Sequence, residues 1–200
     1  MMFSTMTYPF VSSEVDRTKS RWVAKVFLEF ARPKTVHRQT HKLELWLNRS
    51  AFNPLLKPVC NRHGAVLVSS GCPSQKLLQG LFLRATCQTT VLCLSNLSVE
   101  GFSFCSNLAT AIANGRPSGA PEIRVVQGAL TPEQVLLLKI PMVSQKKSTG
   151  GAEKEYRKYL KAYGLNHHKI AELDALEVYF SRGIAGFCDD LLARYKLPGF

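Results

Sequence analysis

The residues best suited to a chemical role are the cations and tyrosines of residues 145–164, which read QKKSTGGAEKEYRKYLKAYG. On a helix, Tyr156, Tyr159 and Tyr163 fall at i, i+3 and i+7 and form one stripe with Leu160. An aromatic stripe at this spacing is typical of a helix face that packs on a core. The lysines and the arginine then face solvent, where they can contact the phosphate groups of a polyanion.

Basic residues are unevenly distributed along the chain, whose formal net charge is +12. Residues 17–62 contain eleven basic and two acidic residues, residues 139–169 contain eight and two, and residues 170–200 contain three and five. Such an excess favours contact with nucleic acid, an anionic membrane or an acidic protein. The residues expected to make this contact are Arg32, Lys34, Arg38, Lys42, Lys146, Lys147, Arg157, Lys158 and Lys161.

Four residues form a weak candidate for a zinc site. His37 and His41 are four residues apart, and Cys60 and His63 form a second pair. Cysteine and histidine are the usual zinc ligands, but this spacing matches no common zinc module. The basic neighbours of His37 would also repel a dication. Solvated histidines and a buried thiol are therefore the favoured interpretation, and no metal or other cofactor is expected.

The sequence contains no recognisable catalytic motif. Cys60 and His63 are the only local pair of a thiol and a base, and no glycine-framed nucleophile turn surrounds any cysteine or serine. The sequence also lacks a phosphate-binding loop, an H-E-x-x-H motif and a dense acidic cluster. His167 and His168 follow Gly164 closely, so they either contact phosphate or lie in a solvated turn. A non-enzymatic protein is therefore expected.

The six cysteines indicate a reducing compartment. None is part of a C-x-x-C pair, most lie in apolar surroundings, and residues 1–15 do not resemble a secretion signal. We therefore expect free thiols and a cytoplasmic location. The most apolar window, residues 77–97, is interrupted by polar residues and falls short of the roughly 20 apolar residues needed to span a membrane.

Strands are expected mainly in the first two-thirds of the chain. Residues 42–49 alternate apolar and polar residues and predict a half-buried strand. Arg21–Arg32 is rich in β-branched and aromatic residues, and we expect it to pair antiparallel with that strand. Residues 34–40, between these two strands, form a basic connector. After the second strand, the prolines and glycine of residues 53–64 indicate a loop or short turn. Further strands are predicted at residues 65–68, 85–94, 98–104 and 122–126.

Helices are expected mainly towards the C-terminus. Short helices are predicted at residues 74–83 and 107–113. Thr131, Pro132 and Gln134 form the signature of a capping box, so a helix should begin there and end before Pro141. A helix is predicted over residues 152–163, and one long helix over residues 168–195. The core stripe of that long helix is Leu173, Leu176, Phe180, Ile184, Phe187 and Leu191.

These elements predict an α+β fold, with a small antiparallel or mixed sheet packed by C-terminal helices. Residues 1–16 are expected to be a loose leader, and residues 17–200 a single domain with a flexible basic loop at about 143–151. The favoured function is an accessory or regulatory protein that binds nucleic acid mainly through phosphate. One alternative is an inhibitor or adaptor whose basic face binds an acidic protein. Another is an enzyme whose site is assembled from scattered residues.

Overall fold

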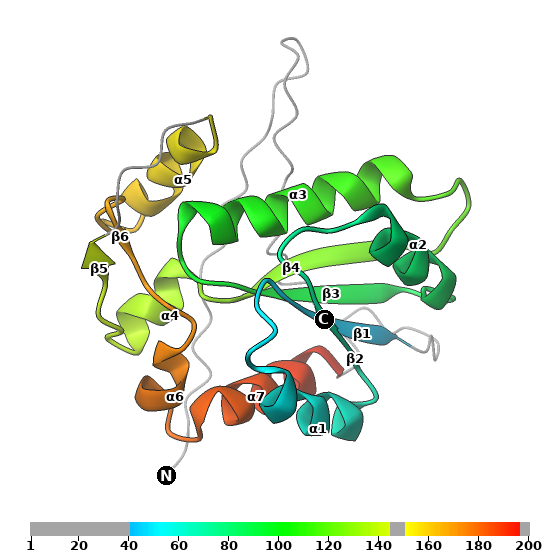
Figure 1. Ribbon diagram of the computed structural model, residues 1–200, viewed down its shortest axis with the longest axis horizontal. Coiled ribbons are helices and arrows are strands. Elements are labelled where there is room, and N and C mark those ends of the chain that lie inside the picture. Colours follow the sequence, from blue (N-terminus) through cyan, green and yellow to red (C-terminus); the bar gives the residue numbers. More distant parts are fainter. Residues whose placement is uncertain (1–40, 145–150, 197–200) are drawn as a thin grey trace, which may run out of the picture.

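The computed structural model describes residues 41–144 and 151–196. In these ranges β-strands and α-helices alternate from β1 to β5 (Figure 1). The strands are β1 (Lys42–Leu47), β2 (Val66–Ser69), β3 (Thr89–Leu94), β4 (Ile123–Ala129), β5 (Val143–Ser144) and β6 (Lys169–Ile170). The helices are α1 (Asn53–His63), α2 (Gln75–Arg84), α3 (Val99–Gly115), α4 (Pro132–Leu137), α5 (Gly151–Lys161), α6 (Ala175–Tyr179) and α7 (Gly183–Lys196).

The main sheet has four strands in the order β2-β1-β3-β4, and all of its pairings are parallel. The expectation of both helices and sheets is confirmed, but the expected antiparallel arrangement of this sheet is wrong. The reason is that α1, α2 and α3 each connect two consecutive strands. A helical crossover returns the chain to the start of the sheet, so the strands run in the same direction. The small β5–β6 pair, by contrast, is antiparallel.

β1 lies in the interior of the sheet rather than at an edge. Its residues 44–47 pair with β2 on one side and with β3 on the other, so this stretch has no free edge for the antiparallel partner expected at Arg21–Arg32. That segment lies outside the described residues. The predicted strand itself is confirmed, but the predicted exposure of its polar face is wrong. Glu44 and Trp46 are buried because α2 covers that face.

Helices cover both faces of the sheet and create two apolar cores. On one face Leu45 and Leu47 belong to a core that includes Leu56 of α1 and Leu192 of α7. On the other face Trp46 and Val91 belong to a core that includes residues of α2 and α3, among them Leu81, Phe104 and Leu108. Figure 1 shows α2 and α3 above the sheet and α1 and α7 below it.

Two segments form helices where the sequence indicated other structures. The predicted loop at residues 53–64 is α1, in which Pro54 occupies the first turn and Gly64 ends the helix at φ 66°. The predicted strand at residues 98–104 is the first part of α3. The hydroxyl of Ser98 accepts a hydrogen bond from the Gly101 amide at 3.1 Å and so caps this helix. The short helices predicted at residues 74–83 and 107–113 are confirmed as α2 and as part of α3.

The C-terminal third confirms the predicted capping box and corrects the predicted long helix. The Thr131 hydroxyl accepts from the Gln134 amide at 3.3 Å, and the Gln134 side chain accepts from the Thr131 amide at 3.0 Å. The segment at 168–195 is instead β6, α6 and α7. Gly183, at φ 63°, begins α7 rather than bending one helix. The predicted stripe is nevertheless buried except at Phe180, which is half-buried.

A second group of elements lies beyond the carboxyl ends of the strands. It consists of α4, α5, α6 and the β5–β6 pair, at the left of Figure 1. A backbone bridge between Leu97 and Ala171 joins this group to the chain that follows β3. Of the basic loop expected at 143–151, residues 143–144 form β5, and residues 145–150 lie outside the described residues, as does the leader at 1–16.

Candidate nucleic-acid interface

α5 docks on the protein through its aromatic stripe, as the sequence predicted. Tyr156 and Leu160 are fully buried, and Tyr159 is partly buried. The hydroxyl of Tyr156 donates a hydrogen bond to the backbone oxygen of Leu97 at 2.9 Å, so its polar end is satisfied. Burial raises the pKa of Tyr159 well above its usual range. These properties are typical of a packing face rather than of a surface that stacks on bases.

Phe102 of α3 is the main aromatic neighbour of this stripe. Its ring centroid lies 6.0 Å from that of Tyr156 and 5.5 Å from that of Tyr159. Tyr159 and Tyr163 contact each other edge to face at 5.7 Å. Because tilted and edge-to-face contacts are the favoured arrangements of aromatic rings, this cluster fixes how α5 is rotated about its own axis.

The rotation of α5 directs four cations to solvent. Lys154, Arg157, Lys158 and Lys161 are all exposed and follow the spacing i, i+3, i+4, i+7, which places them on one helix face. We call these four residues the cationic face of α5. It spans about 10 Å along the helix, at 1.5 Å per residue. Arg157 is also paired with Glu153, one turn earlier, at 3.2 Å.

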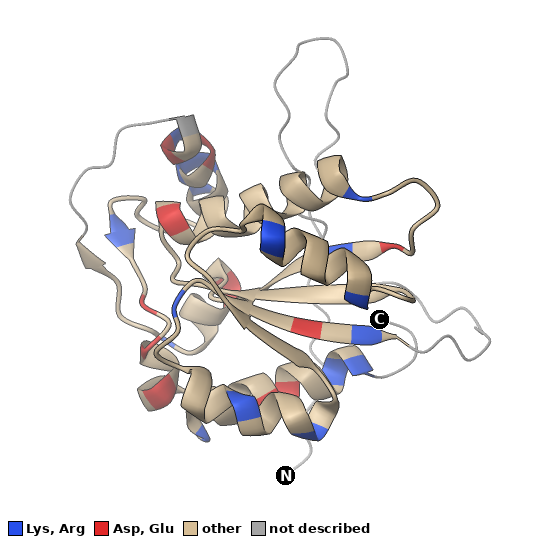
Figure 2. Ribbon diagram, turned by 45° about the vertical axis from the view of Figure 1, so that its right-hand side comes forward, with Lys and Arg blue, Asp and Glu red and all other residues tan. Residues whose placement is uncertain are grey.

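The other basic segment does not form one surface among the described residues. Lys42 lies at the amino end of β1, where its ammonium donates to the Arg84 backbone oxygen and to the Thr86 hydroxyl, both at 2.8 Å. Arg49 follows the opposite end of the same strand. Figure 2 shows basic residues spread over several helices. The remaining candidates, Arg32, Lys34, Arg38, Lys146 and Lys147, lie outside the described residues.

An open crevice occurs at the carboxyl ends of β1 and β2. Its volume is about 440 Å³, and no carboxylate lines it. In open sheets of this kind, ligands bind beyond the carboxyl ends of the strands where neighbouring connections leave on opposite faces. Here the connections that follow β1 and β2 lead to α1 and α2, which cover opposite faces of the sheet (Figure 1). The lining residues are Asn48, Arg49, Ser50, Ala51, Ser69, Ser70 and Gly71.

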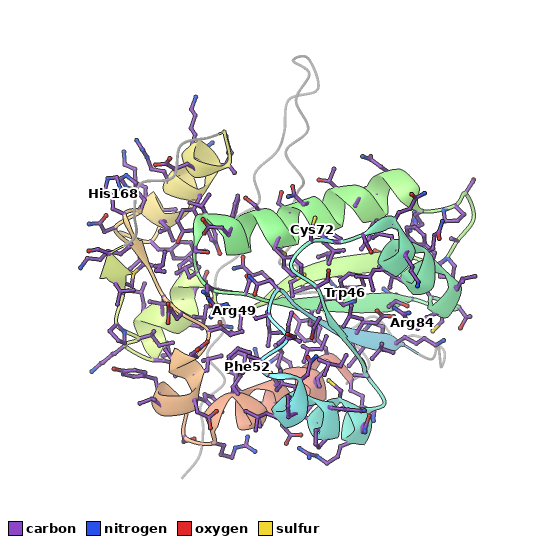
Figure 3. The ribbon with its side chains drawn as sticks, viewed as in Figure 1. Trp46, Arg49, Phe52, Cys72, Arg84 and His168 are labelled. Carbon is purple, nitrogen blue, oxygen red and sulfur yellow. The ribbon has the colours of Figure 1, made fainter. Side chains whose placement is uncertain are left out.

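Arg49 supplies the positive charge of the crevice. It is half-exposed and forms a long ion pair of 3.8 Å with Asp174, which precedes α6 (Figure 3 labels Arg49). The Asn48 Oδ1 atom is covered and has no hydrogen-bond partner among the described residues. The Ser69 hydroxyl, by contrast, donates to Asn53 Oδ1, and that of Ser70 donates to the Cys72 backbone oxygen. The crevice thus combines one cation with neutral polar groups, and Arg49 is the group in it that can attract an anion.

Sequence patterns did not identify this crevice. The signal that could have found it was the alternation of strands and helices, which was obscured because α1 resembled a loop and the start of α3 resembled a strand. Two polar residues that follow β3 serve the fold instead. Asn96 Oδ1 accepts from the Leu173 amide at 2.9 Å, and Ser98 caps α3.

The described residues of the weak zinc candidate make separate contacts and do not come together. His41 Nε2 is hydrogen-bonded to the Thr90 hydroxyl at 2.8 Å, and burial lowers its pKa. Cys60 is buried on α1, and this burial raises the pKa of its thiol to about 11, which disfavours the reactive thiolate. Among the described residues no group of three or more potential ligands is suitably placed for a metal ion. His37 lies outside them.

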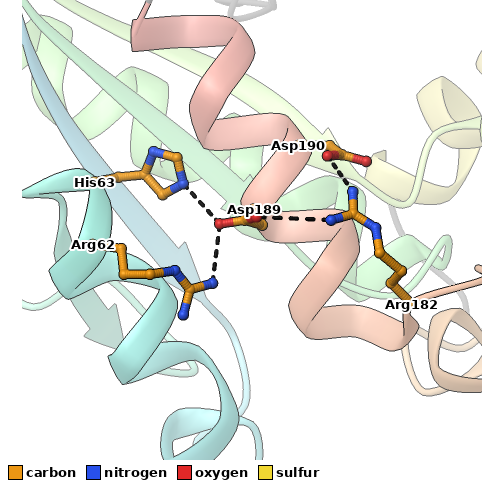
Figure 4. A network of polar contacts seen from close by, with 5 residues as sticks. All are labelled: Arg62, His63, Arg182, Asp189 and Asp190. Carbon is orange, nitrogen blue, oxygen red and sulfur yellow. Dashed lines mark hydrogen bonds and ion pairs between the residues drawn. The ribbon is translucent and has the colours of Figure 1, made fainter.

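His63 belongs to an ion-pair network that links α1 to α7 (Figure 4). Asp189 of α7 accepts from His63 Nε2 at 2.9 Å and from the Arg62 guanidinium at 3.0 Å. Arg182 lies 3.8 Å from the same carboxylate and also pairs with Asp190. The hydrogen bonds from His63 and then Arg62 lower the pKa of Asp189. We call this network the α1–α7 clamp, and it accounts for His63 without a metal.

The thiols and Trp46 complete the comparison with the sequence. All six cysteines are free. Trp46, an aromatic residue of the first basic segment, is fully buried, and its Nε1 donates to Glu44 at 2.8 Å. It therefore cannot stack on a base.

The comparison with known proteins does not assign this chain to a family. No protein-family model matches the sequence, and no curated protein matches it significantly. In the described ranges, no helix combines the length and the apolar character required to cross a lipid bilayer.

Proposed function

We propose that this protein binds nucleic acid without catalysing a reaction, and that its contacts are mainly to phosphate. The observation that carries the proposal is the cationic face of α5. Four exposed cations share one side of a helix whose opposite side is fixed to the protein by Tyr156 and Leu160. A fixed row of cations contacts phosphates at a smaller entropic cost than lysines on a free segment.

The crevice supports the same proposal from a second place. The guanidinium of Arg49 can donate to an anion, since its ion pair with Asp174 is long, at 3.8 Å, and no carboxylate is among the lining residues of the crevice. Contacts of this kind release counterions, so the affinity should fall steeply as salt is added. Phosphate contacts also position a protein without reading the base sequence, so weak sequence preference is expected.

The test is to reverse the charge of three residues of the cationic face. In Arg157→Glu/Lys158→Glu/Lys161→Glu the docking residues are unchanged, so circular dichroism and urea unfolding should show a folded protein. Binding to labelled single- and double-stranded oligonucleotides should weaken. Each lost phosphate contact should reduce the slope of log affinity against log salt by about 0.7–0.9. The measurement is fluorescence anisotropy at several salt concentrations.

A matched control separates local contact from net charge. Lys57, Lys76 and Lys196 are exposed residues of α1, α2 and α7, and their reversal to glutamate changes the net charge by the same amount. This control should retain a salt slope close to that of the wild type. An equal loss in both variants would contradict a local contact at α5. Absence of binding by the wild type at low salt would exclude the proposed function.

The alternative is a protein-interaction module, and one observation favours it. Large apolar side chains are exposed on α4, β5 and α6, which lie together beyond the carboxyl ends of the strands (Figure 1). Exposed apolar groups that cluster are typical of a surface that binds protein. An acidic partner protein would then use the basic groups as well. The side chains concerned are Leu136, Leu137, Val143, Val178 and Tyr179.

A further inference from the structure

Two histidines with their rings in contact lie in the turn that connects α5 to β6. Gly164, at φ 68°, follows the helix, and Asn166 Oδ1 accepts a hydrogen bond from the His168 amide at 2.9 Å. The turn holds the imidazole rings of His167 and His168 with their centroids 3.9 Å apart, inclined by 47°. The sequence left two roles open for this pair, a phosphate contact or a solvated turn.

One ring nitrogen of this pair has no partner. His167 is half-buried as a residue, but its Nε2 atom is covered and makes no hydrogen bond among the described residues. A covered polar atom without a partner costs free energy, so a turn of the His167 ring that brings Nε2 to a bonding group at the surface is favoured. A protonated Nε2 requires an acceptor, and an oxygen of phosphate is a strong one.

The charged groups around His167 belong to α5 and to the turn. Desolvation lowers the pKa of His167, the neighbouring His168 and Arg157 lower it further, and Glu153 opposes them. Because Arg157 belongs to the cationic face of α5, the histidine pair adjoins that face. Two imidazolium rings at this separation repel each other and Arg157, so the free protein resists charging the pair. A bound anion removes this resistance.

We infer that His167 and His168, together with Arg157, form a phosphate contact that is strongest when an imidazole is protonated, so that nucleic-acid binding strengthens as the pH falls. This inference rests on the proposed function and adds a regulatory property to the same surface. With the His167 ring turned to the surface, the phosphate oxygen accepts from Nε2–H and gives this nitrogen the partner it lacks in the free protein. Its negative charge offsets the repulsion between the rings, so binding takes up a proton.

Proton uptake on binding sets the expected size of the effect. Where the complex holds one proton more than the free protein, the association constant rises by up to about tenfold for each unit that the pH falls. The free pKa of His167 lies below the ordinary value of 6.5, so the rise should occur as the pH falls from above that value to below it. The gain should disappear when both imidazoles are replaced.

The experiment measures binding of a labelled oligonucleotide at pH 7.5 and at pH 5.5, at constant ionic strength. The variant is His167→Gln/His168→Gln, whose amides are polar but cannot become charged. His41→Gln is the control, because this histidine lies at the amino end of β1 and is bonded to Thr90. The wild type and the control should bind about tenfold more tightly at pH 5.5 than at pH 7.5. The double variant should show a much smaller increase in affinity. Circular dichroism at both pH values verifies folding.

A second measurement tests the contact without nucleic acid. The imidazole proton resonances of His167 are followed by NMR through a pH titration, in sodium phosphate and in sodium chloride of equal ionic strength. Inorganic phosphate should raise the pKa of His167. An unchanged titration overturns the inference. If the double variant retains the full pH response of binding, the inference is also wrong, while the proposed function stands. If the wild type binds no oligonucleotide at either pH, both fail.

Discussion

The ion pair between Glu44 and Arg84 shows how single residues connect the sheet to its covering helices. Arg84 Nε donates to Glu44 Oε1 at 2.9 Å, and an Arg84 terminal nitrogen donates to Oε2 at 3.0 Å. Glu44 is only 2% exposed, whereas the Arg84 side chain is 38% exposed. The indole of Trp46 donates to the same carboxylate. The carboxylate thus accepts three hydrogen bonds from two residues, and it joins β1 to the end of α2.

Removal of this carboxylate should destabilise the fold. Glu44→Ala leaves the buried Trp46 Nε1 without its acceptor and separates Arg84 from its partner. The free energy of unfolding should fall by about 3 kcal/mol, near the lower end of the range for a broken buried pair, because Arg84 can turn to solvent. Urea denaturation at pH 7 measures the change. Glu172→Ala, at an exposed carboxyl, should change stability by less than about 0.5 kcal/mol.

A loss below about 1 kcal/mol for Glu44→Ala would show that the pair is not important for stability. The pair could not have been predicted from sequence. Alternation in residues 42–49 correctly predicted a strand, but it assigned Glu44 to solvent, because the partner lies 40 residues away on another element. The tyrosine stripe of α5 was predicted correctly because its period is local.

At the scale of elements, α3 depends on a close approach at its first turn. A Cβ atom on Gly101 would lie 2.1 Å from the backbone oxygen of Asn96 and 2.7 Å from the Ser95 hydroxyl. The chain after β3 turns so sharply into the helix that only glycine fits. The helix is anchored there by the Ser98 cap and by burial of Phe104 and other core residues.

Gly101→Ala should therefore be strongly destabilising. The backbone must shift to admit a methyl group, which should cost about 3 kcal/mol, the upper part of the range for overpacked sites. The expected result is a lower midpoint of thermal and urea unfolding. Gly71→Ala is the control, because its Cβ would meet only the Asn48 backbone oxygen, at 3.9 Å. Equal stability of the Gly101 and Gly71 variants would contradict the close approach at α3.

Elements with a local start signal were the ones that sequence predicted best. The capping box at Thr131 occurs as expected, and the helix predicted to begin at residue 74 is capped by the Ser74 side chain. The first turn of α3 was mistaken for a strand because Val99, Phe102 and Phe104 favour extended structure in isolation. Its continuation to Gly115 buries one helix face, and this packing outweighs the local preference.

At the scale of the whole molecule, the errors at α1 and α3 concealed the arrangement of the sheet. When α1 is read as a loop and the first part of α3 as a strand, the order of elements no longer alternates, and an antiparallel sheet becomes the natural expectation. The crevice was missed for the same reason, because it exists only where parallel strands end together. The cationic face of α5 needed no such knowledge, since it follows from one helix.

The α1–α7 clamp joins an early part of the chain to a late one, across 126 residues between His63 and Asp189. Both helices cover the same face of the sheet, so the clamp should help to hold them together on that face. Its strength depends on the ionised form of Asp189. The hydrogen bonds from His63 and Arg62 lower the pKa of this carboxyl in the folded protein, and no such bonds exist in the unfolded chain.

The direction of the pH dependence follows from this lowered pKa. A carboxyl that is more acidic in the folded state contributes its full stabilisation above its unfolded pKa, about 3.9, and loses it as the pH falls through the folded pKa. The free energy of unfolding of Asp189→Asn should therefore change less with pH below about 4 than that of the wild type. At pH 7 the variant should be less stable than the wild type. The measurement is urea denaturation from pH 7 down to the acid limit of folding. Glu172→Gln, at an exposed carboxyl outside the clamp, should keep the wild-type slope of the free energy of unfolding against pH. Identical slopes for Asp189→Asn and the wild type would mean that the clamp does not distinguish the folded from the unfolded state, and that apolar packing alone holds α7 against α1.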